Sequence, residues 1–398
     1  MPGSDETAVV AVIAAGHRLA VWAVEAWDHG EAILPINPAA PRAEQQRLLD
    51  QLRPTHVING GIRESVAGGI PAPGDTAAIV VTSGTTGEPK GVELTRTGME
   101  VMGHGYSAGL DADHRDRWLT CLPLHHVASL GALARAYVTG AQWIAHERFD
   151  IDRVARAPRD EAATIVSLVP TTLLRLLDAG APLHEFRRVI IGGAPLPDAL
   201  RARAVAEGIA IVDAYGLSES WGGFALDGIP ITGIETRLDA ENSEIQVRGA
   251  PVMRGYRLDP QRTVEVLDAD GWLHTGDIGE VDATALGNGG RLRVVDRAKD
   301  LVISGGVNVS PTEVENVLAI HPGIEDVCVI GVPDDEWGER VVAFVVVTPG
   351  SQAPTLETLR AFGAEQLAAP KLPRELRVVD AIPRSTGGKA LRRLLRDS

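Results

Sequence analysis

The stretch Thr82-Ser83-Gly84-Thr85-Thr86-Gly87-Glu88-Pro89-Lys90-Gly91 directly follows the apolar run at residues 77–81 and contains three glycines, four hydroxyl side chains and one lysine. Glycines let backbone N–H groups approach an anion closely, hydroxyls supply further donors, and Lys90 adds a positive charge. The spacing differs from that of a Walker A loop, G-x-x-x-x-G-K-[ST]. An ordinary polar turn after a strand can have a similar composition. The stretch therefore indicates phosphate binding, and other segments must decide between the two interpretations.

The composition is that of a globular protein with more than one domain. The 398 residues exceed what one hydrophobic core usually serves, and 44% of them are hydrophobic and 23% charged. The excess of 53 acidic over 38 basic residues gives a net charge of -15. This charge opposes non-specific attraction to nucleic acid or anionic membranes, so a polyanionic ligand must meet locally placed cations.

The two cysteines and the first residues indicate a cytoplasmic protein. Cys121 and Cys328 lie far apart and form no C-x-x-C pair, so we predict buried thiols and neither a disulfide nor a thiolate metal site. The first six residues lack the basic residues of a signal peptide. We expect no segment that inserts into a membrane, because no apolar stretch is long enough.

Short apolar runs alternate with amphipathic segments over the first two hundred residues, which predicts a wound α/β arrangement. We expect strands at residues 55–59, 77–82, 118–121, 164–168, 188–191 and 209–214, and helices at residues 97–110, 129–140, 170–179 and 197–207. Ligands of such sheets bind outside the carboxyl ends of the strands. Because the Thr82 loop and residues 213–216 both follow predicted strands, we expect them to face one crevice.

The second half of the chain predicts a smaller unit and a separate module. Between residues 228 and 297, short strands separated by Gly and Asp turns indicate an antiparallel or barrel-like unit. Past Asp300 an α+β module begins, with Ser310 as the N-cap of its first helix, Pro311 at the first helical position and Glu313 completing a capping box. The predicted fold is therefore an α/β N-terminal domain of wound sheets with a small barrel-like unit, residues 1–297, followed by a smaller α+β domain, residues 298–398.

Six segments in chain order resemble the adenylate-forming (AMP-binding) superfamily, which includes acyl-CoA ligases, adenylation domains and luciferases. They are TSGTTGEPKG at 82–91, LPLHH at 122–126, AYGLSES at 214–220, GWLHTGD at 271–277, DRAKDLVISGG at 296–306 and PRSTGGK at 383–389. The resemblance covers most of the chain. It implies that a carboxylate and ATP give an acyl-adenylate and pyrophosphate, after which the thiol of CoA captures the acyl group and releases AMP. The implied cofactors are ATP, Mg²⁺ and CoA.

The resemblance also implies a nucleotide site. The loop at residues 82–90 would hold the β- and γ-phosphates, Tyr215 would stack on adenine, Ser218 would contact a phosphate in place of the usual threonine, and Asp277 would accept hydrogen bonds from the ribose hydroxyls. The full set of implied ATP and AMP ligands is Thr82, Ser83, Gly84, Thr85, Thr86, Gly87, Lys90, Gly193, Ala194, Asp213, Ala214, Tyr215, Gly216, Ser218, Asp277 and Arg297.

Three residues match catalytic positions of the superfamily. Glu219 would bind Mg²⁺, which needs few protein carboxylates when phosphate oxygens complete its shell. Lys389 would stabilise the charge that develops on the phosphate oxygens and the leaving pyrophosphate. His126 would lie near the acyl-adenylate, although a histidine in an apolar stretch can equally be structural.

The C-terminal module resembles the mobile domain of the superfamily, which rotates between the two half-reactions. Lys299 matches the hinge position, which is usually Asp or Lys. Gly305 and Gly306 belong to the glycine-rich loop that would approach the pantetheine of CoA.

Within the superfamily, the compact length and three segments resemble the o-succinylbenzoate-CoA ligases of menaquinone synthesis. The segments are residues 122–130, 167–171 and 221–223. The acyl pocket implied by this resemblance consists of His125, Val127, Ser129, Val169, Thr171, Trp221 and Gly222. Trp221 would either shorten that pocket or stack on an aromatic acid. A dicarboxylic acid would also require a second cation in the pocket, and the sequence identifies none.

The sequence leaves two alternative functions to be weighed and excludes a third. A stand-alone adenylation enzyme that loads a carrier protein would share every ATP motif and differ only in its thiol acceptor. A non-catalytic nucleotide-binding protein would be expected to have lost Glu219 or Lys389, and this chain keeps both. A dehydrogenase is excluded, because no G-x-G-x-x-G opens a helix after a strand. The chain could be a monomer or a homodimer.

Overall fold

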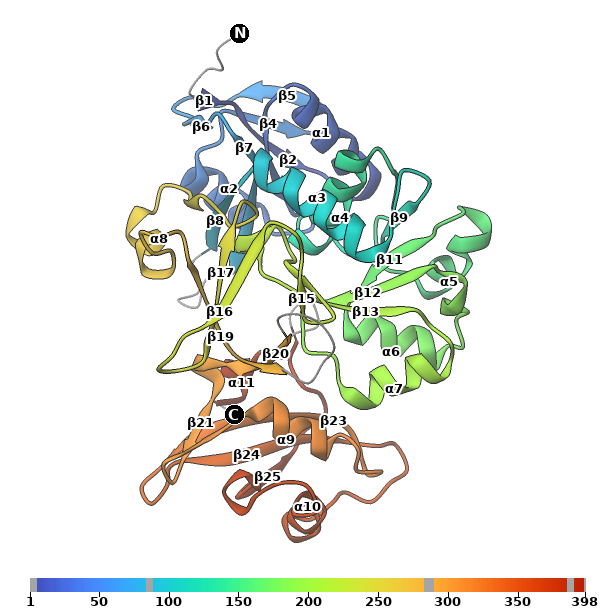
Figure 1. Cartoon of the computed structure of the whole chain (residues 1–398), viewed down its shortest axis with the longest axis vertical. Helices are drawn as coiled ribbons and strands as arrows, with labels where there is room; N and C mark the ends of the chain where they lie inside the picture. Colours follow the sequence, from blue (N-terminus) through green and yellow to red (C-terminus); the bar gives the residue numbers. More distant parts are fainter. Residues whose placement is uncertain (1–5, 84–88, 283–289, 385–389, 397–398) are drawn as a thin grey trace. The chain divides into compact units, whose positions relative to one another are not determined.

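The computed structural model describes residues 6–83, 89–282, 290–384 and 390–396. The chain divides into two compact units, the first made of residues 1–193, 204–237 and 246–275, and the second of residues 194–203, 238–245 and 276–398 (Figure 1). The domain boundary between residues 297 and 298 stays a prediction. Five of the predicted site residues lie outside the described residues: Gly84, Thr85, Thr86, Gly87 and Lys389.

The first unit contains a seven-stranded sheet in the order β18-β8-β7-β3-β2-β4-β5. Its strands are β2 Val9–Ile13, β3 Ala32–Ile36, β4 His56–Asn59, β5 Ile62–Ser65, β7 Thr76–Ser83, β8 Pro89–Thr95 and β18 Gly255–Tyr256. Strands β4, β2, β3 and β7 run parallel, whereas β5, β8 and β18 pair antiparallel with their neighbours. Strands β2 and β3 are continuous apolar runs because both of their faces are covered.

A second seven-stranded sheet has the order β10-β9-β11-β12-β13-β14-β15. Its strands are β9 Arg117–Thr120, β10 Gln142–Ala145, β11 Ile165–Leu168, β12 Arg188–Gly192, β13 Ile211–Tyr215, β14 Ala225–Leu226 and β15 Ile229–Pro230. The first five strands of this order are parallel. Their carboxyl ends therefore meet at one edge of the sheet, followed in the chain by His125, Val169, Gly193 and Gly216.

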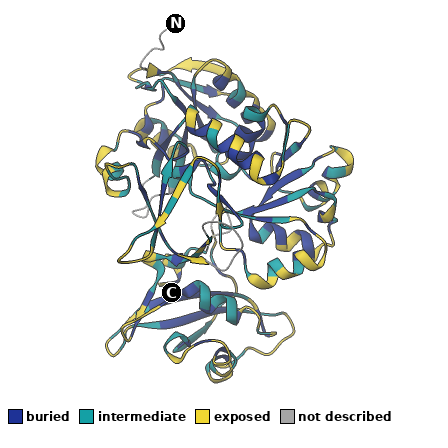
Figure 2. Cartoon of the chain, viewed as in Figure 1, coloured by how far each residue is buried: buried dark blue, intermediate teal, exposed yellow. Residues whose placement is uncertain are grey.

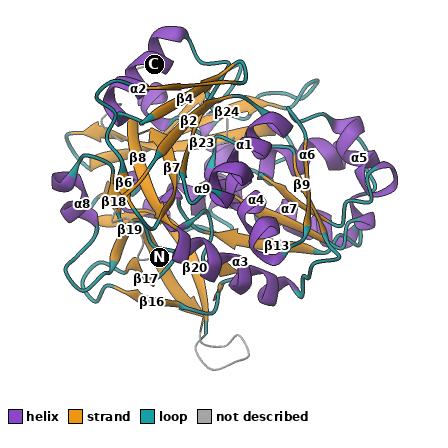
Figure 3. Ribbon diagram, turned by 90° about the horizontal axis from the view of Figure 1, so that it is seen from above, coloured by secondary structure: helices purple, strands orange, loops and turns teal. Residues whose placement is uncertain are grey.

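Helices connect and separate the two sheets. Their bounds are α1 Gly16–Asp28, α2 Arg42–Leu52, α3 Arg96–Leu110, α4 Val127–Thr139, α5 Ile151–Asp160, α6 Pro170–Asp178, α7 Asp198–Ala206 and α8 Pro260–Val266. Helix α1 contacts β2, β3 and β10, α3 contacts β7 and β8, and α4 packs on α3, β9 and β10, so these three helices lie between the sheets (Figures 1 and 3). The central strands of the two sheets and the helix faces turned toward them are mostly buried, whereas the edge strand β5 is exposed (Figure 2). No helix in the described part of the chain is long and apolar enough to cross a membrane.

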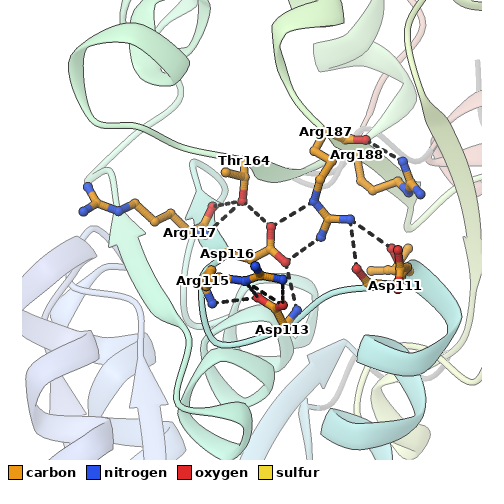
Figure 4. A network of polar contacts seen from close by, with 9 residues as sticks. Asp111, Asp113, Arg115, Asp116, Arg117, Thr164, Arg187 and Arg188 are labelled. Carbon is orange, nitrogen blue, oxygen red and sulfur yellow. Dashed lines mark hydrogen bonds and ion pairs between the residues drawn. The ribbon is translucent and has the colours of Figure 1, made fainter.

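The amino edge of the second sheet is closed by a polar network (Figure 4). Asp116, Thr164 and Arg187 each immediately precede a strand of this sheet. The Asp116 carboxylate accepts hydrogen bonds from the Thr164 hydroxyl at 2.7 Å and from Arg187 Nε at 3.0 Å. Burial raises the pKa of Asp116, but the hydrogen bonds from Arg187 and its other partners hold it below its usual range. The network pairs Asp116, Thr164 and Arg187 with one another, whereas the site residues predicted on this sheet follow the carboxyl ends of its strands.

The remaining strands form smaller sheets. Four of them have the order β16-β17-β19-β20, and β1 pairs with β6. Their bounds are β1 Glu6–Thr7, β6 Ala72–Pro73, β16 Ile234–Leu238, β17 Glu244–Gly249, β19 Leu273–Asp282 and β20 Arg291–Arg297. The short strands expected between residues 228 and 297 are thus present, although β15 and β18 extend the two large sheets.

The second unit contains a five-stranded sheet in the order β22-β21-β24-β23, with β25 paired to β24. Its elements are β21 Val302–Ser304, β22 Val307–Val309, α9 Pro311–Leu318, β23 Ile324–Asp334, β24 Gly338–Val347, α10 Leu356–Gly363, β25 Glu375–Val378 and α11 Arg392–Arg396. Alternate residues of β23 face opposite sides. Val327 and Val329 join a cluster with Leu318 of α9, whereas Cys328 and Ile330 join a second cluster with Leu395 of α11. The unit therefore has a hydrophobic core on each face of its sheet.

The helix start predicted at Ser310 is correct except in one contact. The Ser310 hydroxyl accepts from the Glu313 N–H at 3.1 Å, and Pro311 opens α9. The capping box is wrong, because the Glu313 carboxylate does not return to Ser310 but accepts from Lys371 Nζ at 2.6 Å. Asp296 supplies the additional cap by accepting from the Thr312 N–H at 2.9 Å.

Most predicted elements are confirmed to within a few residues. The expected strands correspond to β4, β7, β9, β11, β12 and β13, and the expected helices to α3, α4, α6 and α7. Cys121 and Cys328 are both free and buried, as predicted, and burial raises the pKa of each thiol to about 12.

Candidate active site

The two ends of the predicted phosphate loop are held by strand pairing. Strands β7 and β8 are antiparallel neighbours, and their register places Thr82 opposite Lys90. The Lys90 ammonium lies 4.4 Å from the centre of the Tyr256 ring, close enough for a cation–π interaction. Lys90 is thus fixed by its strand and supported by an aromatic ring.

Glu219 lies in a single 3₁₀ turn, Ser218–Ser220, just after β13. Its backbone carbonyl accepts from the Met253 N–H at 2.7 Å, and its Oε1 accepts from the Tyr256 hydroxyl at 2.8 Å. Burial and the neighbouring Glu219 carboxylate raise the pKa of Tyr256 well above its usual range, so the phenol remains a donor. Tyr256 therefore contacts both the predicted magnesium ligand and the predicted phosphate-binding lysine.

The residues around Glu219 fit magnesium bound together with a nucleotide. In the described part of the chain, no three His, Cys, Asp or Glu side chains lie close enough to hold a metal ion by themselves. A single carboxylate suits Mg²⁺ when phosphate oxygens and water complete an octahedral shell, whereas it would be a poor site for a metal bound by protein alone.

Tyr215 and Gly193 lie at neighbouring strand ends, where an adenine ring was predicted. The register of β12 and β13 pairs Gly192 with Ala214, one residue before each of them. The Tyr215 ring packs edge-on against Phe224, with ring centres 4.7 Å apart. A side chain at Gly216 would lie 2.3 Å from the Gly223 Cα, so glycine is required for this turn. The turn positions Tyr215, while its contact with adenine stays a prediction.

His125 and His126 lie between β9 and α4, and their ring centres are 4.3 Å apart. Burial, and to a smaller extent the neighbouring His126, lower the pKa of His125 to about 4, and burial also lowers the pKa of His126. Both rings are therefore neutral near pH 7. Neutral rings can line an acyl pocket or accept a proton, so the geometry is compatible with either role predicted for His126.

The predicted acyl-pocket residues divide into two groups. Val127 and Gly222 lie together, since a side chain at Gly222 would approach the Val127 carbonyl oxygen to 3.1 Å. Val169 is buried at the start of α6 beside Gly193, and Thr171, two residues further on, is half-buried. In the chain, these four residues follow the carboxyl ends of β9, β11 and β13.

Ser129 and Trp221 belong to the second group, because their side chains are used inside the protein. The Ser129 hydroxyl donates to the Leu122 carbonyl at 3.0 Å. The exposed fraction of Trp221 is 0%, and its indole N–H donates to the Thr95 carbonyl at 3.0 Å. The interpretation of Trp221 as a ring that stacks on an aromatic acid is therefore not supported, since the ring offers no free face.

In the second unit, Asp277 and Arg297 form a direct ion pair. They are opposite residues of β19 and β20, and Arg297 Nε lies 2.9 Å from Asp277 Oδ1. The Asp277 carboxylate is almost completely buried. The sequence predicted a nucleotide contact for each residue separately and missed this pair, because twenty residues of chain separate them.

The predicted hinge and CoA-binding residues lie in the same unit. Lys299 occupies a 3₁₀ turn, Ala298–Asp300, that follows β20. Gly305 and Gly306 form the turn between β21 and β22, and both have positive φ. The Gly305 N–H donates to the Trp337 carbonyl at 2.8 Å, and a side chain at Gly305 would approach the Trp337 ring to 2.9 Å. Glycine is thus required by both backbone conformation and space.

Comparison with known proteins decides the family. The model of the family described as "AMP-binding enzyme" matches residues 64–281, more than half of the chain, and that of the "AMP-binding enzyme C-terminal domain" matches residues 313–389. This chain belongs to the AMP-binding enzyme family. The predicted adenylate-forming fold and the class of AMP-forming acyl-CoA ligase are confirmed.

Several relatives of this AMP-binding enzyme are named as CoA ligases or synthases. A probable 2-succinylbenzoate–CoA ligase of Mycobacterium tuberculosis is 37% identical over 337 residues, which cover 81% of this chain and 84% of the relative. A feruloyl-CoA synthase of an Amycolatopsis species is 36% identical, covering 80% of this chain and 69% of the relative. Among solved structures, o-succinylbenzoate CoA synthetase from Bacillus subtilis, in complex with the acyl-adenylate intermediate, has 27% identity and a TM-score of 0.85, covering 98% of this chain and 88% of that one. The same synthetase has also been solved with ATP and a magnesium ion.

Two residues of this AMP-binding enzyme were missed by the sequence analysis. One is Tyr256, which lies in a strand of only two residues and carries no motif. The other is Arg135, on the helix that begins directly after His126. The exposed fraction of Arg135 is 2%, its Nε donates to the Met102 sulfur at 3.2 Å, and its guanidinium lies 3.8 Å from the centre of the Tyr106 ring. An amphipathic pattern would place this arginine on a solvent face, so only the packing of α3 on α4 reveals its burial.

Arg135 has no carboxylate partner among the described residues. An arginine remains charged in proteins, although burial lowers the pKa of this guanidinium. A side chain at Gly131 would approach Arg135 Nη2 to 3.4 Å and the Trp221 carbonyl oxygen to 2.8 Å. The guanidinium therefore lies close to the backbone of the segment that bears Trp221 and Gly222, two of the predicted acyl-pocket residues.

Proposed function

We propose that this enzyme is an ATP-dependent 2-succinylbenzoate–CoA ligase, which activates the succinyl carboxylate while the ring carboxylate binds Arg135. The single observation that carries the choice of acid is the buried charge of Arg135. The names of the relatives support it, but they also include a ligase for ferulate, which has one carboxylate. A buried cation beside the pocket favours an acid with a second carboxylate.

The physical reason is the cost of a buried charge. Burying a charged side chain without a partner lowers the stability of a protein by several kcal/mol. A substrate carboxylate that pairs with the charge could recover about this amount. Methionine sulfur is a weak acceptor, and aromatic rings compensate a cation only in part. A planar carboxylate can accept two parallel hydrogen bonds from a guanidinium, which adds direction to the attraction. Arg135 is therefore suited to selecting a dicarboxylic acid over a monocarboxylic one.

The proposed reaction has two steps. In the first, a carboxylate oxygen of the acid attacks the α-phosphorus of ATP, and pyrophosphate leaves. Lys90 and the loop before it would hold the β- and γ-phosphates, and Glu219 would bind the magnesium ion, whose charge lowers the repulsion between the reacting anions. Lys389 would stabilise the charge on the α-phosphate oxygens. In the second step, the CoA thiol loses its proton to water, its sulfur attacks the acyl carbon, and AMP leaves with the oxygen that had joined the acyl group to its phosphate.

Tyr215 and Asp277 would bind the adenosine part of the nucleotide, as predicted from the sequence. Ser218 retains the hydroxyl for a phosphate contact, and Gly193 and Ala194 would line adenine. The Asp277–Arg297 ion pair supports this role in one respect, because it fixes the orientation of a carboxylate that can also accept hydrogen bonds from ribose hydroxyls. We propose a cytoplasmic location, as expected from the sequence.

Product analysis by mass spectrometry tests the proposal. Purified enzyme, ATP and Mg²⁺ are incubated with o-succinylbenzoate, its analogue without the ring carboxylate, ferulate and benzoate, each with and without CoA. We expect AMP and the CoA thioester from o-succinylbenzoate, and at least tenfold less from the analogue, because it cannot pair with Arg135. Equal rates with both acids would contradict the proposed substrate.

The thiol acceptor is tested in the same experiment. An acyl-adenylate that accumulates in the presence of CoA, and is consumed only when a carrier protein with phosphopantetheine is added, would identify the carrier-loading alternative. The absence of AMP with every acid, despite measurable ATP binding, would identify a non-catalytic nucleotide-binding protein. Size-exclusion chromatography with light scattering distinguishes the monomer from the homodimer.

A further inference from the structure

We propose that Tyr256 is a positioning residue that sets the magnesium-binding and phosphate-binding motifs relative to each other. Its hydroxyl would hold Glu219 in the orientation that meets the metal, and its ring would hold the Lys90 ammonium where it meets the nucleotide phosphates. The inference rests on the proposed function of Glu219 and Lys90, and it concerns a residue to which neither the motifs nor the family resemblance gave a role.

The first support is the geometry of the hydroxyl. The Tyr256 hydroxyl donates to Glu219 Oε1 at 2.8 Å, and no described residue donates to Oε2 of the same carboxylate. One oxygen is thus fixed by a donor, and a cation would bind the other. A hydrogen bond of this kind removes the rotational freedom of the glutamate side chain, which would otherwise be lost when the metal binds.

The second support is the ring. The Lys90 ammonium lies over the Tyr256 ring at 4.4 Å from its centre. Lysine carries four rotatable bonds, so its ammonium is a poorly defined charge unless something limits its positions. The ring face supplies a weak attraction of the right sign without neutralising the charge. Lys90 can therefore still pair with a phosphate.

The third support is the backbone that carries Tyr256. Strand β18 pairs with β8, so Tyr256 lies opposite Val92 on the strand that begins at the phosphate loop. The Tyr256 N–H donates to the Thr263 hydroxyl at 2.9 Å. Glu219 is tied to the same segment a second time, through the Met253 N–H. The residues that join the two motifs are thus fixed by main-chain contacts that a change of the Tyr256 side chain leaves in place.

The test is the removal of the hydroxyl with the ring retained. In Tyr256→Phe we expect the Mg²⁺ concentration that half-saturates pyrophosphate release to rise roughly tenfold, since one hydrogen bond to a charged group is lost. By calorimetry, we expect the affinity for ATP to be unchanged without Mg²⁺ and reduced with it. Tyr256→Leu removes the ring as well, and we expect it also to weaken ATP binding without Mg²⁺ by a few fold.

A matched control is available elsewhere in the same unit. The Tyr137 hydroxyl donates to Asp28 Oδ1 at 2.8 Å, so Tyr137→Phe removes a bond of the same type from a place outside the proposed site. We expect it to change neither the Mg²⁺ dependence nor ATP binding. The positioning role is overturned if Tyr256→Phe has the wild-type Mg²⁺ dependence, or if it behaves like a general loss of stability, with ATP binding reduced equally with and without Mg²⁺.

Glu219→Gln separates this inference from the proposed function. If Glu219→Gln leaves the Mg²⁺ dependence unchanged, Glu219 is not the metal ligand, and the proposed site and the role of Tyr256 both fail. If Glu219→Gln raises the Mg²⁺ requirement while Tyr256→Phe does not, only the positioning role fails. In the double variant we expect less than the sum of the two single effects, because the hydroxyl acts through the carboxylate.

Discussion

Arg257 and Arg135 are both almost completely buried, with exposed fractions of 4% and 2%, but their surroundings differ. Arg257 donates to the Glu93 carboxylate at 3.0 Å, to the Leu52 carbonyl at 2.6 Å and to the carbonyls of Arg53 and Ile70. Arg135 donates to one methionine sulfur and lies over two aromatic rings. The first is a structural arginine whose donors are satisfied by the fold. Arg135 carries a charge for which the described residues supply no counter-ion. Its charge is therefore available to bind an anionic substrate.

The largest effect is expected from replacing Arg257, whose donors are satisfied by the fold. In Arg257→Met the Glu93 carboxylate stays buried without its partner, and we expect the free energy of unfolding to fall by about 3–5 kcal/mol. Urea denaturation measures this change. Arg63→Met is the matched control, because the Arg63–Glu31 pair is partly exposed and should contribute less than about 1 kcal/mol. If the two variants lose similar stability, Arg257 is not a structural centre.

The opposite outcome is expected for Arg135. In Arg135→Met a buried charge without a carboxylate is replaced by an apolar side chain, so the free energy of unfolding should stay the same or rise. The value of kcat/KM for o-succinylbenzoate should fall by about 10–100-fold, as for the loss of a charge-assisted hydrogen bond, and that for the analogue without the ring carboxylate should not fall. A loss of stability as large as that of Arg257→Met would show that Arg135, like Arg257, is a structural arginine, and would contradict its role in binding the acid.

A smaller effect on the free energy of unfolding is expected from His125, whose protonation depends on pH. Burial lowers the pKa of His125 to about 4, whereas the unfolded value is about 6.5. Because the folded pKa is the lower one, the neutral ring stabilises the fold above about pH 6.5, and this contribution is lost as the pH falls toward 4. Between pH 7 and 4.5, the free energy of unfolding of His125→Gln should fall by about 2 kcal/mol less than that of the wild type. His104→Gln, at an exposed position, should follow the wild type.

The smallest effect is expected from the sulfur acceptor of Arg135. Met102→Leu conserves volume and removes the sulfur at 3.2 Å, and we expect the free energy of unfolding to change by less than about 1 kcal/mol. Thermal denaturation and the kcat/KM for o-succinylbenzoate would both be measured. A large loss in either would mean that Met102 is the true partner of the guanidinium.

The sequence was sufficient for elements with strong periodic patterns and insufficient for contacts between distant segments. Strand β13 and the turn that bears Glu219 follow from an apolar run and a motif, and the structure has them where they were expected. Helix α1 was not predicted, although Leu19, Ala23 and Ala26 are buried at helical spacing.

The site shows the same division. Residues such as Tyr215 and Glu219 were found because a motif surrounds them. Arg135 was missed because its helical pattern is that of a solvated face, and its burial depends on the packing of α4 against α3. The resemblance implied that Trp221 lines the pocket, whereas the structure has its ring completely buried and its backbone left-handed, with φ of 57°. Neither outcome could be predicted without tertiary contacts.

The two-sided core of the C-terminal sheet has a consequence for how such enzymes diversify. Its buried clusters are made from residues 302–395 alone, whereas every residue proposed to contact the acid lies between positions 125 and 222. The choice of acid and the delivery of the thiol would then be determined by separate segments of the sequence. Recombination between relatives near residue 300 could exchange one trait while the other is inherited intact, and substrate range could change without refitting the rest of the catalytic cycle.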